Sequence, residues 1–503
     1  MAGIGGIDSN MGWDISKTHT LAPRIGVTYG LNDKTVVRAG YGRSFDIGVF
    51  GSIFGHVVTQ NLPVLANQNI NNPTFNTSAF KLDVGPTDPV PIAVPSNGLL
   101  PNPGSQVNSR ARPNPLKFPE VDAWNLALQR AITPTISLTL AYVGNKGTYT
   151  LGDGSGNAIN PNEAAINLPA SLSVNGQALH YDHSVPAGTI AADGGTQTYN
   201  FLRRYYGSTL AACGDASYIT PVGVSPGQCG WTNDVTYYAD NLNTNFNALQ
   251  VTLTQNTWKG LNYTLNYQWA SAFADSTQYA SWDRHVAHGR DSNVRLQQMT
   301  WYGTYELPFG KGKQFAPNVN RATDSIIGGW QLSSVINWAG GLPFTLNYNE
   351  AGTNLPGSAP NYPSYAGAGI MKTNLTGFQA KSGGTGQRTY YTKQTSNLIT
   401  DTGTGVFKNP GMDTVGNVGK NTYIGPSFFN SDLAISKTVT IWEEVAVKFR
   451  MDAFNGFNHI NPGNPGGNIE SDGTISGMAP GCQTGIGSEC APRQLEFSLR
   501  IQF

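Results

Sequence analysis

The chain has 503 residues, of which only 12% are charged, about half of the roughly 25% typical of globular proteins. Its 31 Lys and Arg residues balance its 31 Asp and Glu residues, so the global charge speaks against a nucleic-acid partner and against an acidic disordered chain. No apolar run approaches the roughly 18–20 residues of a membrane-spanning helix, which excludes a helical membrane protein. The 60 glycines, 22 tyrosines, 21 phenylalanines and 10 tryptophans favour β-structure with many turns.

Apolar and polar residues alternate with a period of two along most of the informative segments, and this pattern predicts β-strands. In one of them, Leu265 and Tyr267 share an apolar face, whereas Asn266 and Gln268 share the polar reverse. The pattern predicts about eleven strands, near 24–30, 35–45, 121–132, 136–145, 245–256, 261–273, 294–307, 329–347, 429–438, 444–455 and 493–503.

The connections between these strands alternate between short and long. Tight turns are expected at 31–34, 133–135, 257–260 and 438–442, and long Gly/Asn/Ser/Pro-rich stretches at 46–118, 146–240, 349–428 and 456–492. Strands that run up and down between a side of short turns and a side of long loops are typical of outer-membrane barrels. The expected fold class is therefore all-β: an antiparallel up-and-down transmembrane β-barrel with about eleven strands, a partial barrel that can stay an open sheet, with long extracellular loops and short periplasmic turns.

Aromatic and charged residues fit the same expectation. Trp330 and Trp338 share one face of a strand and differ by about 20 Å in height at a tilt near 40°, close to the spacing of two aromatic girdles. The charges of the last two strands lie opposite the apolar face, so we expect them to face the lumen and to pair between strands; they are Lys448, Arg450, Asp452, Glu496 and Arg500. The alternative is a soluble sandwich with core tryptophans and a solvated charged face.

The four cysteines fall into two local pairs in Gly/Pro/Ser-rich sequence, Cys213 with Cys229 and Cys482 with Cys490. Neither pair has the CxxC spacing of a zinc or redox site. We expect two loop disulfides, formed in an oxidising compartment. The segment at 1–10 has neither the basic region nor the apolar region of a secretory signal peptide.

Catalytic motifs are missing from the sequence, since it contains no GxSxG, HExxH or P-loop pattern. One cluster carries metal-ligand chemistry: Asp283, His285, His288 and Asp291. It falls in a long-loop connection, so a polar surface loop is favoured over a metal site. We expect no enzyme activity, no catalytic residues, no metal and no cofactor.

Aromatic residues in the long loops are candidates for stacking against a ring-bearing ligand. They form two sets, Tyr362, Tyr365, Tyr390 and Tyr391, and Tyr205, Tyr206, Tyr237 and Tyr238. Tyrosine is equally common in large exposed loops without such a role.

A string of motifs in fixed order resembles the Oar-like β-barrel of TonB-dependent outer-membrane transporters. The string contains APRIGVTYG (22–30), KTVVRAGYG (34–42), VDAWNLALQR (121–130), LAYVGNKG (140–147), NFNALQVTL (245–253), YELPFGKG (305–312) and GGWQLSSV (328–335). It continues with NVGKNTYIGPSFFNSDLAISKTV (417–439), FRMDAFNGFNHINPGNP (449–465) and RQLEFSLRIQF (493–503). The resemblance covers most strand positions from Ala22 to Phe503 and is weak in the long loops.

That resemblance implies a barrel of about 22 strands closed around an N-terminal plug, with an N-terminal peptide that contacts TonB. The present sequence contains no plug-like region and about half of the strands. We therefore expect residues 1–503 to be the C-terminal part of such a receptor barrel, with open sheet edges.

Apolar and aromatic residues occupy alternate positions at the C-terminus: Phe497, Leu499, Ile501 and Phe503. This pattern resembles the C-terminal strand that the outer-membrane assembly machinery recognises. Such a strand offers a free edge, an apolar lipid face and an aromatic anchor. A chance final strand is the alternative.

The leading functional hypothesis is the barrel part of a TonB-dependent receptor in the bacterial outer membrane, engaged in energised uptake or export of a ligand. Its expected partners are outer-membrane lipid, the barrel-assembly machinery, the TonB complex through a missing N-terminal region, and an unknown small or macromolecular ligand. Siderophores, saccharides, peptides and exported proteins all stay open as ligands. The alternatives are a surface-exposed structural or adhesion protein anchored by the barrel, and a passive porin.

Overall fold

The computed structural model describes part of the chain in detail. The described residues are 21–46, 77–88, 117–150, 240–275, 285–348, 360–367, 371–373, 389–395, 398, 405–410, 414–442, 445–475 and 492–503. The backbone of several short strands between these ranges is described as well.

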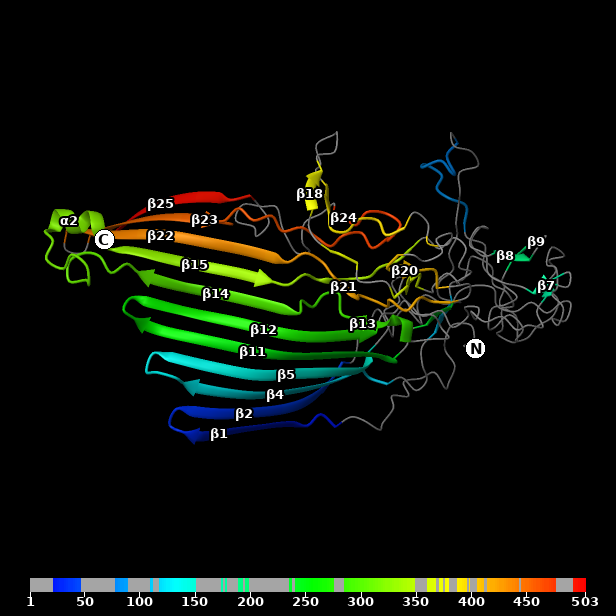
Figure 1. The fold of residues 1–503 in the computed structure, drawn as a ribbon, viewed down its shortest axis with the longest axis horizontal. Coiled ribbons are helices and arrows are strands. Elements are labelled where there is room, and N and C mark those ends of the chain that lie inside the picture. Colours follow the sequence, from blue (N-terminus) through cyan, green and yellow to red (C-terminus); the bar gives the residue numbers. More distant parts are fainter. Residues whose placement is uncertain are drawn as a thin grey trace.

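Eleven long strands follow one another in a single antiparallel meander (Figure 1). They are β1 (Arg24–Asn32), β2 (Thr35–Phe45), β4 (Glu120–Ala131), β5 (Ile136–Thr150), β11 (Leu242–Trp258), β12 (Leu261–Asp275), β14 (Gln297–Glu306), β15 (Trp330–Ala339), β22 (Phe428–Trp442), β23 (Val445–Phe454) and β25 (Gln494–Gln502). A twelfth strand, β13 (His288–Arg290), pairs with the end of β12. The predicted all-β fold with about eleven strands is confirmed.

Short elements lie outside the meander, most of them beyond the loop ends of the long strands, opposite the C-terminus (Figure 1). They are β3 (Ser109–Ala111), β6 (Ser173–Val174), β7 (Gln177–Ala178), β8 (Thr189–Ala192), β9 (Gly195–Thr198), β10 (Val235–Tyr237), η4 (His285–Ala287), β16 (Pro343–Phe344), β17 (Ser364–Tyr365), β18 (Thr376–Gln379), β19 (Gln387–Thr389), β20 (Phe407–Lys408), β21 (Tyr423–Ile424) and β24 (Thr474–Ile475).

Several strand boundaries differ from the predicted ones; β5, for example, continues to Thr150 instead of ending near 145. The strand predicted at 329–347 ends at Ala339, because Gly340 and Gly341 follow it and Pro343 lacks the N–H that a central ladder needs. The turn predicted at 438–442 is wrong, since β22 continues to Trp442 and Thr440 pairs with Ala446 of β23.

The connection between β14 and β15 also differs from the prediction, because it contains a helix that the sequence pattern did not indicate. This helix, α2 (Arg321–Ile327), lies at the turn end of the sheet, close to the C-terminus (Figure 1). Seven residues are too few for a periodic apolar pattern to stand out. In the part of the chain that the structure describes, no helix has the length and apolarity required to cross a membrane.

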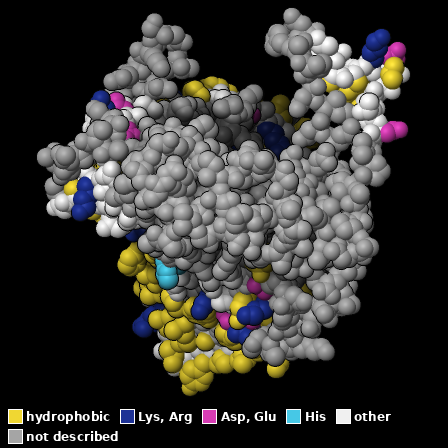
Figure 2. Space-filling view, turned by 90° about the vertical axis from the view of Figure 1, so that its right-hand side faces the viewer, with side chains coloured by type: hydrophobic (Ala, Val, Ile, Leu, Met, Phe, Trp, Pro, Cys, Tyr) yellow, Lys and Arg dark blue, Asp and Glu magenta, His cyan; other side chains and the backbone are white. Residues whose placement is uncertain are grey.

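The register joins the apolar faces of the strands into continuous rows of directly opposed side chains. One row crosses nine strands and contains Tyr29, Val37, Leu128, Leu140, Val251, Tyr267, Met299, Trp338 and Phe429. Because a shift of one residue would turn every side chain of a strand to the other face, burying this row in an apolar phase fixes the register. Viewed from the loop end, hydrophobic side chains gather at the lower margin, at the height of β1 and β2 (Figure 2).

Aromatic rings on the apolar face pack against one another or against glycine. Tyr263 and Trp301, on β12 and β14, stack with ring centroids 4.3 Å apart, and the Trp301 indole donates to Ser334 Oγ at 3.0 Å. Trp124 lies directly opposite Gly144, where a Cβ would come within 2.5 Å of the indole nitrogen. Glycine at this position therefore lets the indole lie flat against the neighbouring strand.

The sheet is open, with β1 and β25 at its two edges. Neither edge strand pairs with a second long strand among the described residues. Their apolar side chains are correspondingly exposed, with Ile25 at 64% and Leu499 at 70%. The meander is thus a wall with two unsatisfied edges rather than a closed cylinder.

A separate hydrophobic cluster, here called the loop core, lies in the connections that follow β15 and β23. Its buried members are Phe344, Leu346, Tyr348, Met371, Tyr391, Leu398, Phe407, Val418 and Ile469. The Tyr391 hydroxyl donates to the carbonyl of Gly466 at 2.6 Å and contacts that of Asn468 at 3.2 Å. Parts of two long loops therefore fold together around a core of their own.

We predict that Leu265→Arg and Asn266→Arg differ sharply in their effect on stability, because their side chains lie on opposite faces of β12. An arginine on a lipid-facing surface at mid-membrane costs about 2–4 kcal/mol, whereas a polar face tolerates it. Denaturant unfolding of the assembled protein in phospholipid bilayers measures both changes. An equal loss of stability, or the greater loss at Asn266, would reverse the assignment of the two faces.

We predict that Tyr362 in the loops titrates late. Burial raises the pKa of its phenol from about 10 to about 12, so its contribution to stability is complete below pH 10 and is lost as pH rises from about 10 to about 12. The difference in phenolate absorbance between the native protein and Tyr362→Phe should therefore appear near pH 12. A difference that appears near pH 10 would show that this tyrosine is solvated.

Candidate functional site

The polar face of the sheet gathers hydrogen-bonding side chains from most of the long strands. One of its rows contains Gln129, Thr139, Thr252, Asn266, Thr300, Asn337 and Asn430. Side chains in this face bond across strands: Thr252 donates to Asn266 at 2.9 Å, and Gln250 donates to Gln268 at 3.0 Å. These uncharged groups satisfy one another while leaving further donors and acceptors for water or a ligand.

The five predicted charges of the last two strands do share this polar face, but they do not pair as expected. Lys448 lies directly opposite Arg500, and Asp452 lies directly opposite Glu496, so each cross-strand pair has like charges. The ion pair forms along β23 instead, where the Arg450 guanidinium donates to Asp452 at 2.6–2.9 Å. Directly opposed residues of these two strands therefore do not pair, although Arg450 also interacts electrostatically with Glu496 of β25. Alternation fixes a residue's face but not its cross-strand partner.

This ion pair borders a shallow hollow of about 550 Å³ on the polar face. Asn262, Thr304 and Ser333 contribute to the hollow from β12, β14 and β15, and Asp432 from β22. Asp432 accepts bonds from the Asn455 backbone N–H at 3.0 Å and from Asn430 at 3.2 Å. The hollow offers carboxylates, hydroxyls and amides at one place, a surface suited to a hydrated polar partner.

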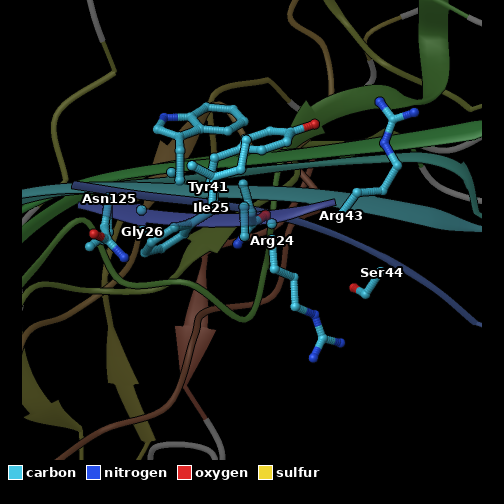
Figure 3. Close-up of a pocket in the computed structure, with 15 residues that line it drawn as sticks. Arg24, Ile25, Gly26, Tyr41, Arg43, Ser44 and Asn125 are labelled. Carbon is cyan, nitrogen blue, oxygen red and sulfur yellow. The ribbon is translucent and has the colours of Figure 1, made fainter. Parts of the chain in front are cut away.

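A second hollow, of about 710 Å³, lies at β1, β2, β4 and β5, towards their loop ends. Figure 3 shows Arg24, Ser44 and Asn125 on one side of these strands and Tyr41 and Arg43 on the other. Most lining residues belong to the polar side: Arg24, Gly26, Gly40, Gly42, Ser44, Ala123, Asn125, Val143, Asn145 and Phe246. Asn125 and Arg24 lie over Gly40 and Gly42, whereas no side chain comes within 4 Å of a Cβ built at Gly26, so a ligand or another chain can approach the backbone closely there.

A charged cluster that the sequence pattern did not indicate lies at the loop end of the apolar side. Arg43 donates to both carboxylate oxygens of Asp122, at 2.8 and 2.9 Å, and lies 3.7 Å from Glu120. The Tyr41 hydroxyl donates to the same Asp122 carboxylate at 2.5 Å. Arg43 and Asp122 are direct cross-strand partners. In the sequence, Arg43 and Asp122 each occupy a position where the alternation predicts an apolar residue. Two such exceptions, in two different strands, were the available signal of the cluster.

The candidate metal ligands do not come together among the residues described. His288 Nδ1 lies 2.8 Å from Asp275, and the imidazole stacks on Phe273 with centroids 5.7 Å apart. Asp291 accepts a bond from the Asn293 backbone N–H at 2.8 Å, and Asp283 lies outside the described ranges. No group of three His, Cys, Asp or Glu side chains in the described ranges is arranged to hold a metal ion.

The first set of loop tyrosines is mostly packed inside rather than presented to a ligand. Tyr362 and Tyr391 are buried at 7% and 2% exposure, and Tyr365 and Tyr390 pack against the loop core. Burial therefore removes the rings of Tyr362 and Tyr391 from a stacking role, whereas Tyr365 and Tyr390 are only partly buried, and stacking by these two stays a prediction. Tyr237 packs against buried Leu242 and Ala287.

Several other predicted residues fall outside the described ranges. They are Tyr205, Tyr206 and Tyr238 of the second tyrosine set, and the cysteines Cys213, Cys229, Cys482 and Cys490. The two loop disulfides stay a prediction.

The C-terminal residues singled out by sequence lie on the apolar face of edge strand β25. Phe497, Leu499 and Ile501 stand directly opposite Met451, Phe449 and Val447 of β23. Phe503, the last residue, is 96% exposed. The strand therefore presents an apolar face together with an unpaired edge.

We predict that Glu496→Gln stabilises the protein slightly, by up to about 1 kcal/mol, because it removes a like charge directly opposite Asp452. Asp452→Asn should have the reverse effect, since Arg450 would lose its ion-pair partner. Unfolding of both variants at low and high salt measures the changes, and high salt should shrink both. A loss of stability in Glu496→Gln would show that the attraction between Glu496 and Arg450 outweighs the repulsion between Glu496 and Asp452.

Comparisons with solved structures give weak overall similarity. The ferripyoverdine receptor of the outer membrane of Pseudomonas aeruginosa matches 96% of this chain, which covers 33% of the receptor, with 10% identity and a TM-score of 0.36. The outer membrane transporter YddB from Escherichia coli matches 94% of this chain, which covers 39% of YddB, with 9% identity and a TM-score of 0.35. The siderophore receptor PirA from Acinetobacter baumannii matches 96% of this chain, which covers 41% of PirA, with 9% identity and a TM-score of 0.35. The chain spans well under half the length of each.

Among curated proteins, no sequence gives a significant match. A family model does match, and it covers nearly the whole chain. The model for the outer membrane beta barrel domain aligns with residues 1–495, in agreement with the antiparallel meander and its two faces of opposite polarity. The chain belongs to the outer membrane β-barrel domain family, a family of the bacterial outer membrane.

Proposed function

We propose that this chain forms part of the wall of a TonB-dependent outer-membrane receptor of the Oar-like kind, which takes part in energised transport of a ligand. The observation that carries the proposal is the open meander, in which eleven long strands leave β1 and β25 as unpaired edges. A wall of this kind needs additional strands to become a barrel.

Strand direction makes closure of the meander on itself unfavourable. Successive strands alternate in direction, so β1 and β25 both run from the loop side to the turn side. Joining them would create a parallel ladder, although every neighbouring pair of the meander is antiparallel. Bacterial single-chain barrels have an even number of antiparallel strands. In hydrocarbon, each backbone group left unpaired at an open edge costs several kcal/mol. Strands beyond residues 24–502 would remove that cost.

In such a barrel, the polar face lines the lumen and the apolar face contacts lipid. Lys448, Arg450, Asp452, Glu496 and Arg500 then belong to the lumenal wall. A wet lumen tolerates the directly opposed like charges, because water and counterions screen them. The two hollows of the polar face would contact the plug or the passing ligand.

The roles of the other partners follow from the same proposal. The exposed edge and apolar face of β25 make Phe497, Leu499, Ile501 and Phe503 suited to recognition by the barrel-assembly machinery. Contact with TonB would be made by a part of the receptor that precedes the barrel. The loop core would give the extracellular side a preformed surface for a ligand, with siderophores as the first class to test beside saccharides, peptides and proteins.

We predict that cells with the assembled receptor accumulate its ligand only when the proton-motive force is intact. Cells are given a panel of radiolabelled ferric siderophores, with and without a protonophore, and the radioactivity that accumulates inside them is measured. Cells that lack the chain are the control. Ligand that binds to the cell surface equally with and without the protonophore, and never accumulates, would support the adhesion alternative. Uptake that continues unchanged after de-energisation would support a passive porin.

A further inference from the structure

Two apolar side chains are exposed on the polar face of the sheet. Tyr302 of β14 and Val335 of β15 are direct cross-strand partners. They share the polar face with Thr300 and Asn337, which lie two residues away along the same strands. Tyr302 is 48% exposed and Val335 is 40% exposed. Because the pair lies on the face opposite the apolar rows, contact with lipid does not explain this apolar patch.

Hydrogen-bonding side chains border the patch within the hollow of about 550 Å³. One step towards the turn side, the register aligns five residues of the hollow in a row: Asn262, Thr304, Ser333, Ala434 and Asp452. The small side chain of Ala434 leaves room between its two polar neighbours. The patch is therefore bordered by an amide, two hydroxyls and a carboxylate.

The ion pair between Arg450 and Asp452 adds a planar donor and acceptor to this border. Arg450 Nε lies 2.9 and 2.8 Å from the two carboxylate oxygens, and Nη2 lies 2.6 Å from the first of them. The Arg450 side chain is nevertheless 44% exposed, and the Asp452 side chain 21%. A guanidinium and a carboxylate each offer more hydrogen-bonding sites than this pair uses. The pair can therefore bind two neighbouring hydroxyl groups of a ligand.

The hollow and its surroundings carry no excess of one charge. The charged side chains on the polar face of β12, β14, β15, β22, β23 and β25 are the acidic Glu306, Asp432, Asp452 and Glu496 and the basic Lys448, Arg450 and Arg500. Glu306 pairs with Lys313 of the neighbouring connection at 3.1 Å, which leaves three acidic and three basic residues. Such a surface gives a charged ligand little net attraction, so a neutral ligand is favoured.

The backbone around the hollow is already paired. Each of β12, β14, β15, β22 and β23 has an antiparallel neighbour on both sides. An extended peptide that adds to a sheet does so through main-chain bonds at a free edge, and these five strands have none. Recognition at the hollow therefore depends on side chains: hydroxyls, an amide, an ion pair and an aromatic ring.

We propose that this hollow is a binding site for a neutral saccharide, with one sugar ring packed on Tyr302 and Val335 and its hydroxyls bonded to the surrounding polar groups. A sugar ring has an apolar C–H face and a polar rim, and the hollow has the same division between patch and border. Its volume of about 550 Å³ falls within the roughly 300–1,000 Å³ of small-molecule sites. The inference rests on the proposed function, because it takes the polar face as the lumenal wall, and it selects saccharides among the ligand classes left open above.

The test measures binding by the purified, assembled receptor, so it needs no energised membrane. Calorimetry titrates three neutral trisaccharides, one each of α-linked glucose, β-linked glucose and β-linked xylose. The uncharged peptide N-acetyl-Ala-Tyr-Ala-amide represents the competing class of ligand. We expect at least one trisaccharide to bind and the peptide not to bind.

Variants with the heat-modifiable migration of a folded barrel assign the roles of the side chains. Tyr302→Ala should weaken saccharide binding about ten-fold, because the sugar ring loses the surface on which it packs, whereas Tyr302→Phe should keep most of the affinity. Thr304→Val should weaken binding several-fold through the loss of a hydrogen bond. The matched Thr139→Val, on the polar face but outside the hollow, should leave binding unchanged.

Thiol protection locates the ligand. Ser333→Cys should react with a water-soluble maleimide, and the bound trisaccharide should slow this reaction several-fold. The proposal is overturned if no trisaccharide binds, if only the peptide binds, if Tyr302→Ala binds saccharide as tightly as the native receptor, or if the maleimide cannot reach Ser333→Cys.

The inference and the proposed function fail in different ways. Energised accumulation of a siderophore by a receptor that binds no saccharide would contradict the inference alone. Saccharide binding by a receptor whose cells never accumulate a ligand would contradict the proposed function alone.

Discussion

Pairing of every backbone N–H and C=O inside a hydrocarbon layer is the constraint on which this structure depends. Each strand between β1 and β25 satisfies both of its edges through antiparallel neighbours. Among the strands that the structure describes in the meander, only the two outermost leave a row of backbone groups unpaired on one side. A β-sheet can meet the constraint completely only by closing into a cylinder, which is why the proposed receptor includes strands beyond the eleven described ones.

The two faces of the sheet follow from the same setting. Lipid on one side selects the continuous apolar rows, and these rows in turn fix the register of every strand. Once the register is fixed, it also determines which side chains lie opposite one another on the polar face. This explains why Lys448 meets Arg500 while Arg450 turns to Asp452 along its own strand.

The sequence predicted the eleven strands and their faces because period-two alternation is a local property. It did not predict partners that depend on register or on distant segments. Arg43 and Asp122 meet only when β2 and β4 pair across a long connection. The loop core was invisible for a similar reason, since Tyr391 and Ile469 come from different loops without periodicity. The helix α2 escaped notice because it is only seven residues long.

The most direct test of the account is cysteine crosslinking at the two edges of the sheet in the outer membrane. One cysteine is introduced into β1, first at Val27, and one into β25, first at Leu499, each alone and both together. Further variants move each cysteine along its strand, so that every possible register between the two strands is tested. The account predicts that no position in β1 crosslinks to β25 within one chain, and that each edge crosslinks to strands beyond these residues. A crosslink between β1 and β25 would show that the eleven strands close on themselves and would contradict the account.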